Sequence, residues 1–136
     1  LRCLDEELQE RFRKFAREFK GKAASPGISY VEHTIDGVTW FTTSLHEANE
    51  FLSKKDYLAN WAMEVNEEFG VFTVDEWVQE LRTTGYRVLH AASYLNPWIE
   101  ENRYDGHVWL HSDADGRPGE RITAPDTTGV IVAEKV

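Results

Sequence analysis

The sequence of 136 residues contains a single cysteine, Cys3. One cysteine excludes both an intramolecular disulfide and a zinc site built from several thiolates. The sequence also lacks a run of about 18 apolar residues and a basic-then-apolar signal at its start. We therefore expect a soluble, cytoplasmic protein that has no membrane among its partners.

Positive charge is scarce, because 15 Lys and Arg face 24 Asp and Glu and give a net charge of -9. A protein that binds a polyanion normally needs a positive face to displace counterions. We therefore expect no nucleic acid among the partners. Residues 1–25 are the exception, with seven Lys and Arg against five Asp and Glu. We interpret them as a solvated helix face, with a docking surface for an acidic partner as the alternative.

Glycine-rich phosphate loops are absent, because none of the nine glycines forms a G-x-G. Backbone amides that cradle a phosphate require closely spaced glycines at a strand-to-helix turn. Neither G-x-S-x-G nor H-E-x-x-H occurs, so hydrolase chemistry has no recognisable centre. His107 and His111 lie in a predicted strand, where their rings would be about 13 Å apart, too far to share a metal ion. The turn at Asp113 is not a calcium loop, because Pro118 replaces the required glycine.

What the sequence does contain is enough apolar material for one core, at 41% of residues, and clear periodicity. Asp36-Gly37 predicts a two-residue turn between strands at 28–35 and 38–43. Capping boxes at Ser44 and Thr73 predict helices from the residues that follow them. Asp56 is predicted to cap a helix that ends at Gly70. A first helix, ending near residue 20, is predicted from apolar residues at three- and four-residue steps: Leu4, Leu8, Phe12, Phe15, Ala16 and Phe19.

The inward faces of the later helices follow from the same spacing. The helix after Asp56 should bury Tyr57, Leu58, Trp61, Ala62, Val65 and Phe69. The helix after Thr73 should bury Trp77, Val78 and Leu81, and Gly85 should follow its end.

Strand-like patterns dominate the last third of the sequence, at residues 86–95, 107–111 and 128–134. Asn96-Pro97 should end the first of these strands, and residues 113–119 have the composition of a turn. No linker is long enough to divide the chain. We predict a single α+β domain over residues 1–136, with about four helices packed on a mainly antiparallel sheet. The N-terminal hairpin and the C-terminal strands would supply that sheet.

Two clusters of polar and aromatic residues are candidates for a binding site. Residues 60–68 place carboxylates, including Glu64, on the polar side of a predicted helix around Trp61, where they could meet a cationic substrate or act as acid and base. A solvated helix face is the alternative. Residues 96–103 display Asn96, Trp98 and Arg103 in a predicted loop, where recognition groups are commonly found. Otherwise Asn96 caps a turn and Trp98 covers the sheet. These five residues are our candidates for substrate contact.

Residues 72–88 (FTVDEWVQELRTTGYRV) and 128–135 (TGVIVAEK) resemble the tail of class I S-adenosylmethionine-dependent methyltransferases. In that family, a helix with this phrasing leads through a Gly-aromatic step into a late strand. The family's chain then finishes on an antiparallel partner strand that ends near a lysine. The helical stretch before residue 72 resembles the region that the family inserts over its substrate. The resemblance extends from about Ser44 to the end.

The resemblance implies that this chain is the C-terminal, substrate-side part of such an enzyme and the fragment of a larger protein. The family's Gly-rich loop, and the acidic residue that holds the cofactor ribose, have no counterpart here. S-adenosylmethionine is therefore implied for the full-length protein and not for this chain alone, which should transfer no methyl group. The implied partners are a small-molecule substrate or the missing N-terminal half. No catalytic residue is carried over, because none of the matched positions is a defined catalytic one.

Two other functions remain open on the sequence. A free-standing module could recognise a small ligand or a partner protein through residues 96–103. A half-enzyme should expose a large apolar patch where its absent sheet belongs, whereas a complete module should not. A small complete enzyme that uses carboxylates such as Glu64 and Glu68 is the third possibility.

Overall fold

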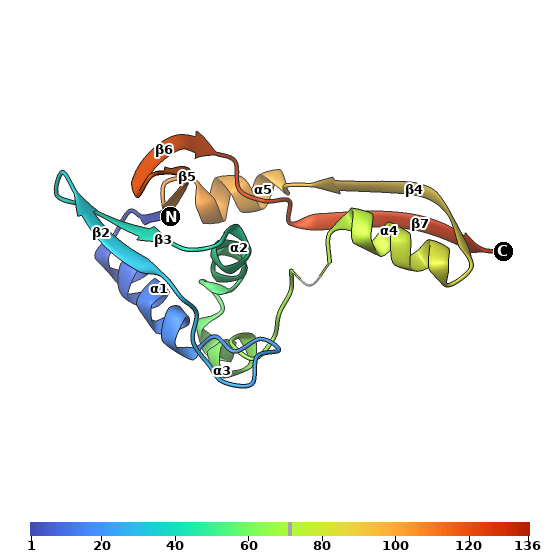
Figure 1. Cartoon of the computed structure of the whole chain (residues 1–136), viewed down its shortest axis with the longest axis horizontal. Coiled ribbons are helices and arrows are strands. Elements are labelled where there is room, and N and C mark those ends of the chain that lie inside the picture. The colour runs from blue at the N-terminus through green and yellow to red at the C-terminus, as the bar shows by residue number, and fades with distance from the viewer. Residues whose placement is uncertain (71) are drawn as a thin grey trace.

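The computed structural model describes residues 1–70 and 72–136. In that part of the chain, five helices and seven strands in antiparallel sheets form an α+β fold, which confirms the predicted class. Figure 1 shows a body from which a long arm extends. The arm consists of α4 (Val74–Thr83), β4 (Tyr86–Tyr94) and β7 (Thr128–Lys135).

Helix α1 (Glu6–Glu18) supplies the centre of the body's core, as its apolar stripe predicted. The Asp5 carboxylate caps it by accepting a hydrogen bond from the Leu8 amide at 2.7 Å,. Phe12 is fully buried, and its ring centroid lies 4.5 Å from that of Phe41 and 5.1 Å from that of Phe51. Such aromatic contacts join the helix to a strand and to a second helix.

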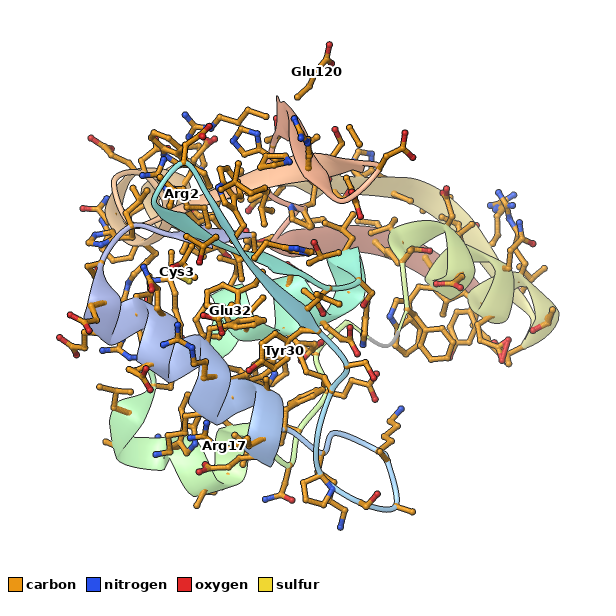
Figure 2. The ribbon with its side chains drawn as sticks, turned by 60° about the vertical axis from the view of Figure 1, so that its left-hand side comes forward. Arg2, Cys3, Arg17, Tyr30, Glu32 and Glu120 are labelled. Carbon is orange, nitrogen blue, oxygen red and sulfur yellow. The ribbon has the colours of Figure 1, made fainter. Side chains whose placement is uncertain are left out.

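The predicted N-terminal hairpin is confirmed as β2 (Val31–Ile35) and β3 (Val38–Thr42). Asp36 and Gly37 have φ angles of 52° and 75°, the left-handed values that a two-residue hairpin turn requires,. Figure 2 shows Tyr30 and Glu32 between this hairpin and α1. The Glu32 carboxylate accepts a hydrogen bond at 2.7 Å from Arg13 of the helix. The hairpin is therefore fastened to α1 by an ion pair as well as by packing.

A second set of strands completes the body: β1 (Arg2–Cys3), β5 (Val108–Ala114) and β6 (Arg117–Ile122), in the order β1-β5-β6. Leu1 and Phe41 exchange two backbone hydrogen bonds of 2.8 Å, which link this sheet to the β2–β3 hairpin. The turn predicted at residues 113–119 connects β5 to β6, a strand that the sequence did not predict. The strands of the described residues thus form three small antiparallel sheets.

Helix α2 (Leu45–Lys54) begins with the predicted capping box at Ser44. Its Glu50 carboxylate is buried and accepts hydrogen bonds from the Phe69 amide at 3.0 Å and the Gly70 amide at 2.6 Å. Lys54, also buried, lies 3.5 Å from the centroid of the Phe69 ring. These contacts fasten the segment before the arm to α2.

The single helix predicted from Asp56 to Gly70 is wrong in extent. The structure has a 3-10 turn, η1 (Leu58–Asn60), followed by the short α3 (Trp61–Glu64). Backbone hydrogen bonds of the helical type continue only to the Glu67 amide, which donates to the Glu64 carbonyl at 3.2 Å. The carbonyl of Val65 accepts the Lys20 amide at 2.7 Å, and the amides of residues 69 and 70 bind Glu50. Trp61 and Val65 are buried as predicted, whereas four residues predicted to be inward are exposed: Tyr57, Leu58, Ala62 and Phe69.

In the arm, α4 begins with the predicted capping box at Thr73 and is followed by Gly85 at a φ of 83°. It packs on one face of the β4–β7 ribbon: a Cβ atom added to Gly129 would lie 2.9 Å from Val74 Cγ2. Val78 is buried and Leu81 is partly buried, but Trp77, predicted to be inward, is 47% exposed. One helix on a two-stranded ribbon is too narrow to bury the indole.

The other face of the ribbon is left uncovered by the residues that the structure describes. Side chains alternate along a strand, so Val130 and Val132 point away from the face that carries Gly129. Their partners on β4 are Ala92 and His90, and Tyr94 follows on the same face. The apolar face, defined as Tyr94, Val130 and Val132, has exposed fractions of 47%, 42% and 48%. Leu89 lies at the irregularity between Val88 and His90 and is 57% exposed.

Candidate functional site

The five residues selected from the sequence fall into two groups. Asn96, Trp98 and Arg103 lie on α5 (Pro97–Ile99) and the following π-helical turn η2 (Glu100–Tyr104). Trp61 and Glu64 lie on α3. Figure 1 shows α5 and α3 on opposite sides of α2. The structure therefore does not bring all five residues to one site.

Trp61 packs into the core rather than presenting a free indole. It is 7% exposed, and its Nε1–H donates to Glu18 of α1 at 2.6 Å. Glu64 is partly buried, and its Oε2 has no hydrogen-bond partner in the described part of the chain. A substrate role for these two residues stays a prediction, and Trp61 is already explained by packing.

The second group is more open. The predicted loop at 96–103 is helical, because Pro97 occupies the first helical position and the Asn96 side chain accepts the Trp98 amide at 3.0 Å,. The Asn96 backbone amide donates to Thr127 Oγ1 at 2.9 Å. Trp98 is 58% exposed, and Arg103 Cζ lies 5.7 Å from the centroid of its ring. Asn96 therefore positions the helix that displays the other two side chains.

The centre of this site is Asp56, which the sequence assigned to a helix cap. Its carboxylate instead pairs with Lys55 Nζ at 2.7 Å, Arg103 Nη1 at 3.2 Å and Arg11 Nη1 at 3.8 Å. Arg11 is placed by donating to the Lys55 carbonyl at 2.8 Å. We call Asp56, Arg11, Lys55, Trp98 and Arg103 the Asp56 cluster.

Sequence reasoning missed Asp56, Lys55 and Arg11 as members of this site. They come from the end of α2 and from α1, while Arg103 lies much later in the chain. Ion pairs over such separations leave no periodic signal. The only hint was composition, because Arg11 belongs to the basic first segment.

Tyr104 closes the inner side of the cluster. It is 5% exposed, and burial, followed by the nearby Asp56 and Tyr57, raises the pKa of its hydroxyl to about 12. The hydroxyl therefore stays protonated at neutral pH. It is not available as a base.

A small cavity of about 90 Å³ lies elsewhere, between the β2–β3 and β5–β6 hairpins. His33, Trp40, His111, Asp113 and Arg117 are among its lining residues. The His111 Nδ1 hydrogen-bonds the Gly119 carbonyl at 2.9 Å, and its Nε2 is buried. Pockets for organic ligands are usually on the order of 300–1,000 Å³, so this cavity alone is smaller than such pockets. A more open hollow of about 440 Å³ adjoins it and shares His33 and Arg117.

Two features are absent from the described residues. They contain no group of three or more His, Cys, Asp and Glu side chains that could hold a metal ion. None of their helices combines the length and apolar character that crossing a bilayer requires.

No family model, curated protein or solved structure matches this chain.

Proposed function

We propose that this chain is the C-terminal, substrate-side portion of an S-adenosylmethionine-dependent methyltransferase and that it does not transfer methyl groups alone. The observation that carries the proposal is the uncovered apolar face of the arm, Tyr94, Val130 and Val132. The resemblance rests on the order of the elements in the arm: a helix (α4), a Gly-aromatic step, a strand (β4) and a final antiparallel strand (β7).

A two-stranded ribbon with a single helix is incomplete as a structural unit. Such ribbons are marginally stable unless further strands or packing support them. In the described part of the chain, β4 and β7 pair only with each other, so each leaves one edge of backbone donors and acceptors open,. A contiguous exposed apolar face marks an interaction surface. The cofactor-binding half of a methyltransferase would supply both a neighbouring strand and a covering layer.

The Asp56 cluster would then serve as the substrate side of the enzyme. It lies in the helical part of the body and in the segment between the two arm strands. Because Asn96 is hydrogen-bonded to Thr127, the segment that displays Trp98 is attached directly to the end of the ribbon. S-adenosylmethionine would bind the full-length protein, and the methyl acceptor would meet the cluster.

A free-standing binding module is the second candidate, favoured by the exposure of Trp98 and Arg103. Both candidates use the same cluster to recognise a ligand. They differ in the arm, because a complete module has no reason to leave an apolar ribbon face uncovered.

The first test is the intact mass of the natural gene product in its source cells, compared with 15.7 kDa. We expect a larger product that binds S-adenosylmethionine, and no binding to the 136-residue chain. A natural product of 15.7 kDa would contradict the proposal.

A second test uses the larger product with Val130→Lys and Val132→Lys on the apolar face. Burying two ammonium groups at the junction should weaken cofactor binding about tenfold or more. The matched control is Val31→Lys on β2 of the body, a somewhat more exposed valine at 55%, which should leave cofactor binding unchanged. Equal effects of the arm and control variants would argue against a junction at the arm.

A further inference from the structure

We propose that Arg103 and Trp98 bind a ligand that carries a carboxylate, or another planar oxyanion, next to an aromatic ring. Calling this ligand the substrate rests on the proposed function, but the binding itself does not. The inference rests on an excess of positive charge around Asp56, on the free donors of Arg103 and on the exposed indole beside them.

Three cations surround one carboxylate at Asp56. Lys55 is 3% exposed and lies closest to it, at 2.7 Å, and Arg11 also pairs with Glu7 at 2.6 Å. Within ion-pair distance the three cations face two anions, Asp56 and Glu7, so the cations outnumber the anions by one. Because Arg103 is the most exposed of the three, at 43%, that extra positive charge is presented to solvent at its guanidinium.

The guanidinium of Arg103 has donors to spare. It carries five N–H groups, and its Nη1 is the atom that pairs with Asp56, at 3.2 Å,. No other ion pair to Arg103 occurs among the described residues, although Glu100 and Glu101 lie on the same helical turn. The N–H groups on the opposite edge of the guanidinium can therefore donate to both oxygens of a carboxylate, in the bidentate geometry that arginine favours.

Trp98 supplies the second half of the site. Its backbone is fixed by the Asn96 cap and by the Asn102 side chain, which donates to the Trp98 carbonyl at 2.9 Å. The indole is 58% exposed, and the Arg103 guanidinium lies over its ring, with Cζ 5.7 Å from the centroid. An aromatic ring packed against the exposed edge of this indole, on the side of the guanidinium, would place its attached oxyanion next to Arg103. Aromatic contacts of this kind strengthen binding beyond the burial of area.

Arg121 and Trp109 form a matched pair elsewhere in the body. Arg121 Cζ lies 5.2 Å from the ring centroid of Trp109, and its guanidinium pairs with Asp105 at 3.5 Å. Arg2 lies against the same ring, at 4.8 Å. Two guanidiniums therefore occupy Trp109, whereas in the described residues Trp98 meets only Arg103. The Arg121 pair has the same chemistry without a free indole, and it serves as the control.

The experiment is a titration of the 136-residue chain with benzoate, followed by the indole N–H resonance of Trp98 in nitrogen-15 spectra. We expect benzoate to shift that resonance in a saturable way. Acetate should bind with lower affinity, and benzamide should cause no saturable shift. Arg103→Gln, followed by the Trp98 indole resonance, and Trp98→Leu, followed instead by the side-chain N–H resonance of Arg103, should each weaken benzoate binding about tenfold, and Arg103→Lys should weaken it less. Arg121→Gln should have no effect.

Two results would overturn the inference. One is a benzoate shift that does not saturate at millimolar concentration. The other is equal weakening by Arg121→Gln and Arg103→Gln, which would indicate a general effect of charge. Far-ultraviolet circular dichroism verifies that each variant is folded, and Trp98→Leu supplies an independent test if Arg103→Gln is not.

The outcome is separable from that of the proposed function. Benzoate binding that depends on Arg103, in a protein whose natural product binds no S-adenosylmethionine, would retain the site and reject the methyltransferase. Cofactor binding by a larger natural product, with no benzoate binding by the 136-residue chain, would retain the methyltransferase and reject the site.

Discussion

Lys54 Nζ lies 2.6 Å from Glu50 Oε2, one helical turn away on α2, and neither side chain is more than 1% exposed. The carboxylate also holds the amides of Phe69 and Gly70, and the ammonium lies over the Phe69 ring. The pair thus connects a helix of the body to the segment that leads into the arm. All of its polar atoms have partners, so it is a structural element rather than a reactive one.

Breaking this pair should be costly. Lys54→Met removes the ammonium and leaves Glu50 as a buried charge with amide partners only, so the free energy of unfolding should fall by about 3–5 kcal/mol. Urea unfolding followed by circular dichroism measures the change. Glu134→Gln, which breaks the exposed pair of Glu134 with Arg87, is the control and should cost less than about 0.5 kcal/mol. If Lys54→Met lowered the free energy of unfolding by less than about 1 kcal/mol, the Glu50–Lys54 pair could not be buried as described.

The two capping boxes should be separable by their effects. Ser44→Ala and Thr73→Ala each remove a hydroxyl that accepts an amide at the start of a helix. Each substitution should lower the free energy of unfolding by about 1 kcal/mol if unfolding is cooperative. Hydrogen exchange in Thr73→Ala should accelerate in α4 and leave α1 unchanged. Equal acceleration in both helices would show that the arm and the body open together.

Stability should decline in acid partly through Glu32. Hydrogen bonds from Arg13 hold the pKa of this carboxyl below its ordinary value of 4.5. A lowered folded-state pKa stabilises the protein above 4.5, and that contribution is lost as pH falls through the folded-state pKa. Carbon-detected titration of Glu32 should show the low pKa, and Arg13→Gln should return it towards 4.5. An unchanged pKa in that variant would mean that Arg13 is not the cause.

Cys3 should be unreactive in the folded protein. Burial raises the pKa of its thiol to about 12, and the residue is 1% exposed. The thiolate is the reactive form, so iodoacetamide at pH 8 should label Cys3 far more slowly in buffer than in concentrated urea. Labelling by mass spectrometry at equal rates in both solutions would show that β1 is not packed as described.

Local sequence signals identified the elements with strong periodicity or definite caps. The stripe through Phe12, the Asp36-Gly37 turn and the boxes at Ser44 and Thr73 depend on contacts within a few residues, and all four predictions are confirmed. The helix after Asp56 was overextended because its end is determined by Glu50 and Lys20, which approach from other elements. Local periodicity contains no record of such partners.

The candidate site was predictable to the same extent. Asn96, Trp98 and Arg103 lie within eight positions of one another, and the structure keeps Trp98 and Arg103 together. Asp56 and Arg11 join them through folding alone. Trp61 was selected because its neighbours are polar, but its indole packs on α1 through a bond to Glu18. Helical spacing had also placed Trp61 on the inward face, and the structure confirms that prediction.

The separation of β4 from β7 along the chain has a consequence for folding. Tyr94 pairs with Thr128, and residues 95–127 cross the body between them. Closing this long connection loses chain entropy before any ribbon contact forms, so pairing waits until α5, β5 and β6 are in place. The ribbon is therefore expected to be the last part to assemble and the first to open. An opening of that kind would free Asn96 from Thr127 while the aromatic centre around Phe12 is still intact.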